Sequence, residues 1–191
     1  MNNVLRHEIL RKHQKTLHEL SEDDSDNEVP FYMTDCEEKA IDFDEVKNEY
    51  SANLGISQYP KSIDAILPIK DNLLFIEFKN GCIKKEKENI RIKLWESLLI
   101  ICDILGCTLS NIRSKSDFIL VYNEQKNSPK CSSMSPSFEK IAQNVGRLAK
   151  ERKIRFGFEQ LKKIYFRDVM TLTEKEFSQY LGVIFNKNTK T

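Results

Sequence analysis

The chain lacks the features that define fibrous and membrane-spanning proteins. It has only 6 glycines and 5 prolines in 191 residues, which excludes a collagen-like repeat and a chain made mostly of linkers. Its strongest apolar run, residues 94–105, is interrupted by Glu96, Ser97 and Asp103 and is shorter than the roughly 20 apolar residues that cross a bilayer. The first residues lack the basic, apolar and small-residue order of a signal peptide. We therefore expect a cytoplasmic protein with no membrane partner.

Cysteine and histidine are few and scattered. The five cysteines include no Cys-x-x-Cys pair, so we predict neither a disulfide framework nor a structural zinc site. His7, His13 and His18 do not share one helical face and are not predicted to bind a metal. A Gly-x-x-x-x-Gly-Lys phosphate loop is also missing, which argues against an ATP-driven motor.

Negative charge is concentrated in one segment, although the net charge of the whole chain is only +1. Residues 19–49 contain 13 acidic and two basic side chains, a net charge of −11, which leaves +12 for the other residues. Such a division suggests a body that binds a polyanion and a segment that competes with it. A solvated acidic loop with no partner is the simpler explanation of the same composition.

Hydrophobic periodicity predicts an α/β fold in which helices flank a mixed central sheet. The expected helices cover residues 3–20, 42–53, 85–105 and 136–152, with a final helix capped by Thr173. The expected strands cover 62–69, 73–79, 118–122 and part of 161–170. We expect residues 1–41 to form an N-terminal helix and acidic segment, and residues 42–191 to form the α/β domain. Trp95 is predicted to pack in the core.

Three charged residues interrupt the apolar pattern of the expected hairpin. Glu77 and Lys79 share a face of their strand, because strand side chains alternate between the two faces. The turn decides which residue lies opposite Asp64: a two-residue loop at 70–71 gives Glu77, a three-residue loop gives Phe78, and a loop at 71–72 gives Lys79. In every register the three charged side chains cluster.

Two carboxylates that meet in a partly buried site repel each other and lose hydration. One lysine offsets part of this cost, and a divalent cation would offset the rest. Mg²⁺, or Mn²⁺, suits such a site because Mg²⁺ binds a couple of carboxylates and keeps waters and phosphate oxygens as its other ligands. A neighbouring lysine can then serve the attacking water and stabilise charge on a phosphate. The simpler alternative is a Lys79–Asp64 ion pair with Glu77 solvated on an exposed face.

The spacing of Asp64, then twelve residues, then Glu77-Phe78-Lys79 resembles the signature of the PD-(D/E)XK nuclease superfamily, which includes many restriction endonucleases and Holliday-junction resolvases. The expected elements over about residues 42–123 are similar to its restriction-endonuclease-like core. The resemblance implies a Mg²⁺- or Mn²⁺-dependent nuclease with Asp64 and Glu77 as metal ligands and Lys79 as the catalytic lysine. The motif's proline does not directly precede Asp64, where Ile63 stands.

The resemblance also implies a further metal ligand from the preceding helix, for which we assign Glu49 and keep Glu45 as the alternative. Basic residues follow the motif and are predicted to bind the nucleic-acid backbone: Lys84, Lys85, Lys87, Arg91 and Lys93. DNA is favoured over RNA as the substrate, with specificity that is loose or supplied by a homodimer or protein partner. A role in bacterial or phage genome defence would suit such a nuclease.

The competing hypothesis is a catalytically inactive nuclease-fold binding module, serving as an immunity, inhibitor or assembly subunit. In that case the acidic segment or the basic surface binds a protein or nucleic-acid partner. A further alternative treats residues 1–40 as an autoinhibitory arm.

Overall fold

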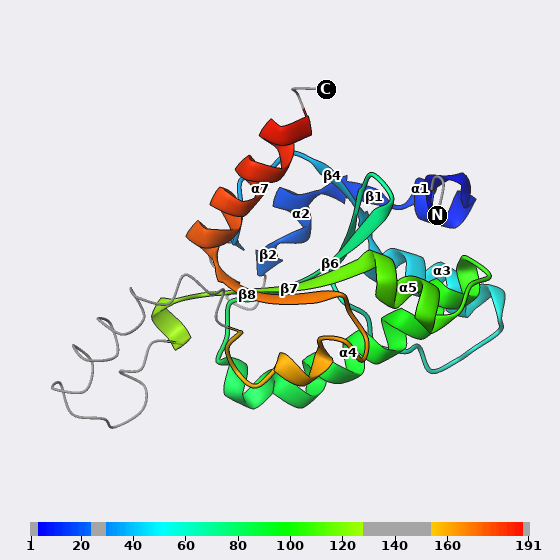
Figure 1. The fold of residues 1–191 in the computed structure, drawn as a ribbon. Helices are drawn as coiled ribbons and strands as arrows, with labels where there is room; N and C mark the ends of the chain where they lie inside the picture. Colours follow the sequence, from blue (N-terminus) through cyan, green and yellow to red (C-terminus); the bar gives the residue numbers. More distant parts are fainter. Residues whose placement is uncertain (1–3, 24–29, 128–153, 189–191) are drawn as a thin grey trace, which may run out of the picture.

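A six-stranded mixed sheet forms the middle layer of the protein, as the computed structural model shows for residues 4–23, 30–127 and 154–188 (Figure 1). Across the sheet the strands lie in the order β1 (Gln14–Thr16), β4 (Lys39–Asp42), β5 (Ala65–Ile69), β6 (Asn72–Lys79), β7 (Ser116–Tyr122) and β8 (Asp168–Thr173). The first four strands are antiparallel to their neighbours, whereas β6, β7 and β8 are parallel. The strands β2 (Glu22–Asp23) and β3 (Phe31–Tyr32) form a separate small hairpin. The α/β class with a mixed sheet is therefore confirmed.

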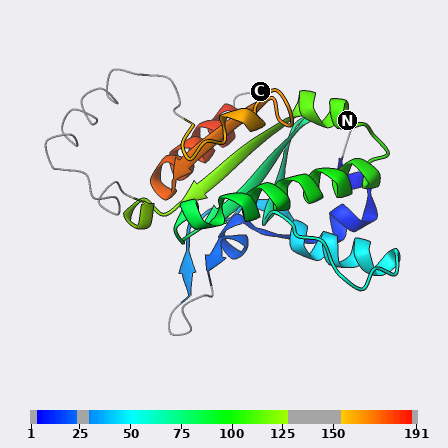
Figure 2. The same ribbon diagram turned by 90° about the horizontal axis from the view of Figure 1, so that it is seen from below.

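Helices cover both faces of this sheet. The long helix α4 (Ile83–Ile104) runs across one face, and α7 (Glu174–Asn188) and α2 (Leu17–Leu20) lie on the other (Figures 1 and 2). The α4 face also receives the short elements η1 (Val4–Arg6), α1 (Glu8–Lys12), α3 (Phe43–Asn53), α5 (Leu109–Lys115) and η4 (Glu159–Leu161). A 3-10 turn, η2 (Gln125–Asn127), follows β7. Among the described residues, no helix has both the length and the apolarity needed to cross a bilayer.

The two cores follow from the alternation of side chains along β6. Leu73 and Phe75 point to the core under α4, whereas Leu74 and Ile76 point to the core under α7. Burial on both faces explains why 118–122 is a continuous apolar run, as predicted for a central strand. Glu77 follows in the same alternation and faces α4.

A two-residue turn fixes the register of the β5–β6 hairpin. Ile69 pairs with Asn72, so Lys70 and Asp71 form the turn, and Lys70 takes the left-handed backbone conformation with φ of 55°. Continued back from the pair Ala65–Ile76, this register places Asp64 opposite Glu77. Of the three predicted turn geometries, the structure has the first.

The predicted helix over residues 3–20 is wrong, because it is broken into α1 and α2 by strand β1. Residues 14–16 pair with β4 and so join the edge of the sheet, and β4 itself extends to Asp42, across the predicted boundary after residue 41. Leu10 packs in the core under α4, whereas Leu17 packs in the other core, so one straight helix could not bury both. Thr16 and Glu19 form a capping box that starts α2, a signal that the sequence contained.

Other differences lie near the ends of elements. The last strand is β8 at Asp168–Thr173 rather than within 161–170, and the helix α5 was not predicted although Thr108 caps it. Trp95 is 41% exposed instead of buried. The final helix begins as predicted, with a capping box between Thr173 and Glu176. The predicted helix 136–152 lies outside the described residues.

A buried serine links α4 to Ile63, the residue directly before Asp64. The hydroxyl of Ser97 is fully buried and accepts a hydrogen bond from the backbone N–H of Ile63 at 3.0 Å. We expect Ser97→Ala to lower the free energy of unfolding by about 1–3 kcal/mol, because it leaves a buried N–H without a partner. Urea unfolding measures this loss.

The matched control is Ser114→Ala, which removes an exposed hydroxyl bonded to its own helix, and which should change stability by less than about 0.5 kcal/mol. Equal stabilities for the two variants would contradict this role for Ser97.

Candidate active site

Asp64 lies directly before the first residue of β5, Ala65, and so precedes the paired part of the strand. Its backbone carbonyl accepts a hydrogen bond from the N–H of Phe43 at 3.2 Å, which ties it to the start of α3. Its side-chain Oδ2 accepts from the backbone N–H of Phe78 at 2.6 Å. The carboxylate therefore takes the place of a strand carbonyl, and its orientation is set by β6.

Glu77 lies on β6 beneath α4 and is fully buried. Lys93 extends from α4 to both carboxylates, with its Nζ 2.8 Å from Glu77 Oε1 and 3.1 Å from Asp64 Oδ1. Lys79 Nζ lies 3.6 Å from the same Glu77 oxygen. The second carboxylate oxygen of Glu77, Oε2, is buried and has no hydrogen-bond partner. The simpler expectation, a solvated Glu77 on an exposed face, is therefore wrong.

Burial controls the ionisation of these side chains. It raises the pKa of Glu77 to about 8, and the negative charge of Asp64 adds to the rise. Burial also raises the pKa of Asp64, against the opposing effect of Lys93. For Lys93, burial lowers the pKa, but the charges of Asp64 and Glu77 outweigh it and the net shift is upward. The site thus keeps its ammonium group charged and resists placing a second negative charge next to the first.

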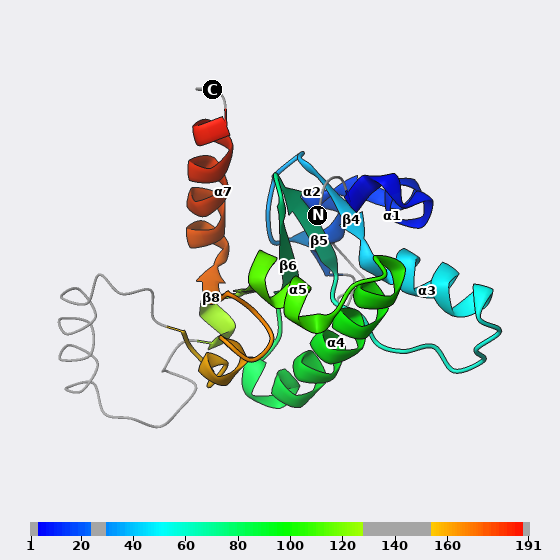
Figure 3. The same ribbon diagram turned by 45° about the vertical axis from the view of Figure 1, so that its right-hand side comes forward.

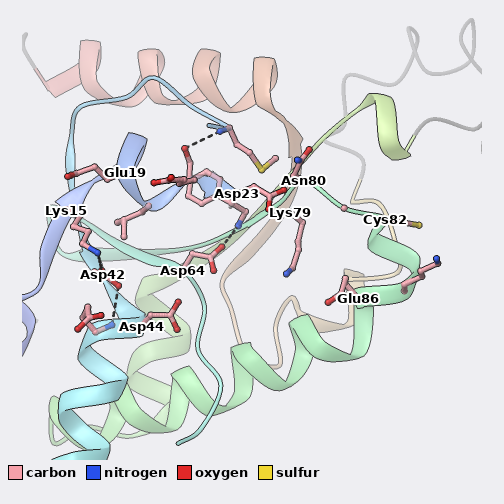
Figure 4. Close-up of a pocket in the computed structure, with 18 residues that line it drawn as sticks. Lys15, Glu19, Asp23, Asp42, Asp44, Asp64, Lys79, Asn80, Cys82 and Glu86 are labelled. Carbon is pink, nitrogen blue, oxygen red and sulfur yellow. Dashed lines mark hydrogen bonds and ion pairs between the residues drawn. The ribbon is translucent and has the colours of Figure 1, made fainter. Parts of the chain in front are cut away.

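A cavity of about 770 Å³ opens over this cluster and is lined by Asp64 and Lys79 (Figure 4). Figure 4 shows Lys79 extending between Asp64 on one side and Glu86 on the other. The cavity is strongly acidic, since eight lining side chains are acidic and three are basic. Six of the acids come from two chain segments: Glu19, Glu22 and Asp23 around β2, and Asp42, Asp44 and Glu45 at the start of α3.

The predicted third metal ligand, Glu49, is engaged elsewhere. Its Oε2 lies 2.6 Å from Lys12 Nζ and 2.7 Å from His13 Nε2, and it does not line the cavity. Glu45, the alternative, does line it. Within the described ranges, no group of three or more His, Cys, Asp or Glu side chains is arranged to hold a metal ion. The carboxylates that the structure brings together are Asp64 and Glu77.

The five basic residues predicted to bind nucleic acid do not share one surface. Lys84 and Lys85 are exposed, and Lys85 lines the cavity. Arg91 pairs with Glu88 at 3.0 Å. Lys87 is directed to the segment at Gly157, where an added Cβ would lie 2.7 Å from its Nζ. The fifth residue, Lys93, is inside the site.

The position of Lys93 in the site was missed from the sequence, although a signal was present. On a helix, residues three and four positions apart are neighbours. Lys93 is three residues after Ile90 and four before Ser97, both of which are fully buried. A lysine between two buried positions on the same side of a helix must reach a buried negative charge or extend out of the core. The sequence analysis instead predicts that Lys93 binds the nucleic-acid backbone.

Comparison of the chain with protein-family models, curated proteins and solved structures finds no significant match. The resemblance to the PD-(D/E)XK nucleases therefore stays a hypothesis based on the motif and on the geometry of the site.

The ionisation of Glu77 gives a pH-dependent stability. Its pKa of about 8 in the folded protein exceeds the ordinary value of 4.5, so folding favours the protonated form. The stability that Glu77 contributes is complete below about pH 4.5 and is lost as the pH rises through 8. We expect Glu77→Gln, which cannot ionise, to be more stable than wild type at pH 9 by about 2–5 kcal/mol, since one pKa unit corresponds to about 1.4 kcal/mol. Urea unfolding without metal should show this advantage shrinking towards pH 5.

Glu88→Gln is the control, because Glu88 is exposed on the same helix. Its stability relative to wild type should stay nearly constant over this pH range. A stability difference between Glu77→Gln and wild type that did not change with pH would contradict the expected cost of ionising the buried Glu77.

Proposed function

We propose that this protein is a Mg²⁺- or Mn²⁺-dependent nuclease with a restriction-endonuclease-like core, which hydrolyses phosphodiester bonds in DNA rather than RNA. The observation that supports this most strongly is the meeting of Asp64, Glu77 and Lys79 at one point of the β5–β6 hairpin, beside an acidic cavity. These are the side chains that the motif singles out. Buried carboxylates at such a cost to stability are typical of a functional site.

The carboxylates suit a hard divalent cation. The buried Glu77 Oε2 has no partner, and Asp64 opens to the cavity, so each offers an oxygen of the kind that Mg²⁺ prefers. We assign Asp64 and Glu77 as the protein ligands, with water and phosphate oxygens as the others. When bound, the metal ion would polarise a phosphate oxygen and lower the pKa of a water molecule.

Lys79 is the residue that would act on the substrate. Its ammonium group lies beside Glu77 and lines the cavity, with a side chain that is 22% exposed. From there it can hold the attacking water or donate to a phosphate oxygen as negative charge develops. Asp64 keeps its orientation through the N–H of Phe78, so the reacting groups are held by β6.

The charges that line the cavity suit an enzyme that binds a polyanionic substrate together with divalent cations. The eight acidic side chains of the cavity repel a bare polyanion, and bound divalent cations reduce that repulsion. We propose that Lys84 and Lys85, at the exposed start of α4, contact the nucleic-acid backbone. Specificity would be loose or supplied by a second copy or a protein partner. We place the enzyme in the cytoplasm, in bacterial or phage genome defence.

Cleavage assays test the nuclease proposal. With Mg²⁺ or Mn²⁺, the wild type should cut plasmid, linear or single-stranded DNA, and EDTA should abolish the reaction. Lys79→Ala should lower the rate by a factor on the order of 10² to 10⁴, because it removes a group that assists proton transfer and stabilises charge. Gel analysis of the products, with RNA as a parallel substrate, measures the effect.

Lys175→Ala, which removes an exposed lysine on α7, should cut at the wild-type rate. Cleavage that survives EDTA or the loss of Lys79 would contradict the proposal, and so would the absence of cutting by folded wild type with either metal.

The acidity of the cavity favours one alternative, the binding module. Glu19, Glu22 and Asp23 bring negative charge to the lining of the cavity, so a cationic protein segment would be attracted where nucleic acid is repelled. In this alternative the cluster of Asp64, Glu77 and lysines is structural. Deletion of the N-terminal residues cannot test it, because Leu10 and Leu17 are buried in the two cores.

Neutralising two acidic side chains that line the cavity distinguishes a nuclease from a binding module. For a nuclease, Glu22→Gln combined with Glu86→Gln should tighten the binding of a short DNA duplex by about threefold to tenfold in low salt, because two repulsive charges are removed. The gain should fall as salt is added. Fluorescence anisotropy measures the dissociation constant.

For a binding module, the same double variant should bind an oligolysine peptide more weakly than wild type does, and its DNA affinity should not change. Glu88→Gln, on α4 but outside the cavity wall, is the matched control and should change neither dissociation constant.

A further inference from the structure

We propose that Lys93 is the resident counter-cation of the site, and that its ammonium group and a divalent metal ion compete for the oxygens of Asp64 and Glu77. Lys93 would then regulate metal loading, as a positioning residue distinct from the catalytic Lys79. This inference rests on the proposed function, since it assigns a role within the same site.

The contacts of Lys93 carry the proposal. Its Nζ lies within hydrogen-bonding distance of both carboxylates, at 2.8 Å from Glu77 Oε1 and 3.1 Å from Asp64 Oδ1. It therefore bridges the two groups, as a shared cation does. Its side chain is only 17% exposed, and it does not line the cavity. Lys93 thus sits on the protein side of the carboxylates, whereas Lys79 lies on the cavity side.

The local charge explains why the two cations compete. When all four groups are ionised, the two carboxylates and the two lysines carry no net charge. A dication that approaches this group gains little attraction and meets an ammonium already in contact with both of its ligands. Removing Lys93 lowers the net charge of the remaining groups by one, whether Glu77 is ionised or protonated. The metal should therefore bind more tightly when Lys93 is replaced by a neutral residue.

The place of Lys93 in the fold makes it a suitable regulator. It is on α4, the helix whose Ser97 accepts a hydrogen bond from the N–H of Ile63, directly before Asp64. A shift of α4 relative to the hairpin would therefore move the ammonium group and the metal ligands relative to each other. The cluster needs no metal to hold its two carboxylates together, since Lys93 already does so.

The test measures Mn²⁺ binding by the full-length protein at one fixed pH, without nucleic acid. Isothermal titration calorimetry gives the affinity, and the melting temperature with and without Mn²⁺ gives a second readout. We expect Lys93→Gln to bind Mn²⁺ about tenfold more tightly than wild type, and to melt at a lower temperature without metal. Saturating Mn²⁺ should restore the lost thermal stability.

Lys93→Arg keeps the positive charge and adds a planar group that binds carboxylates at two points. It should bind Mn²⁺ no more tightly than wild type, and this variant decides the matter if Lys93→Gln fails to fold without metal. Lys175→Gln, on α7, controls for the loss of a lysine elsewhere and should bind as wild type does.

The outcomes separate this inference from the proposed function. Equal or weaker Mn²⁺ binding by Lys93→Gln, with measurable binding by wild type, would overturn the role of Lys93 and leave the nuclease proposal standing. Tighter Mn²⁺ binding by Lys93→Arg than by wild type would also overturn it. Binding by Lys93→Gln but not by wild type would support the inference and count against a metal enzyme in the native chain. No Mn²⁺ binding by any folded variant would overturn both.

Discussion

A pair of adjoining carboxylates, one fully buried and the other only partly exposed, is the constraint on which the rest of the site depends. Asp64 and Glu77 meet at the end of the β5–β6 hairpin, where burial penalises the ionised form of each. The fold supplies compensation from two directions, since α4 sends Lys93 to both groups and β6 gives the N–H of Phe78 to Asp64. One oxygen of Glu77 still lacks a partner. This cost supports the proposed binding of a cation, because buried ion pairs contribute little to stability.

The hairpin and α4 cooperate to build this arrangement. The two-residue turn at Lys70–Asp71 sets the register that brings the carboxylates opposite each other. Helix α4 then crosses the same face of the sheet (Figure 3). This helix carries both Lys93 and Ser97. The N-terminal segment completes the site from the other side, because β1 joins the sheet and the residues after it line the cavity. Six acidic side chains of residues 19–23 and 42–45, parts of the acidic segment, therefore line the cavity.

The sequence was most informative where the local pattern and the tertiary contacts agree. The hairpin, α4 and β7 were predicted because their apolar pattern matches their burial, and the start of α7 was predicted from its capping residues. Residues 3–20 were misread because helical spacing of leucines is also produced by two short helices that face different cores. The edge strand β1 and its neighbour β4 are short, and they are set by pairing, β1 with β4 and β4 also with β5, rather than by propensity. Of the site, Asp64, Glu77 and Lys79 were found from alternation. The position of Lys93 between the buried Ile90 and Ser97 was overlooked, and the contacts of Glu49 with Lys12 and His13 depend on how short elements far apart in the chain meet, which the sequence does not specify.

The most direct test of the central claim is a crystal structure of the protein with Mn²⁺, located by its anomalous scattering. We expect one or more Mn²⁺ ions bound to oxygens of both Asp64 and Glu77, on the side where Lys79 faces the cavity. Mn²⁺ bound only among the acids of the cavity wall, with Asp64 and Glu77 still bridged by Lys93, would contradict it.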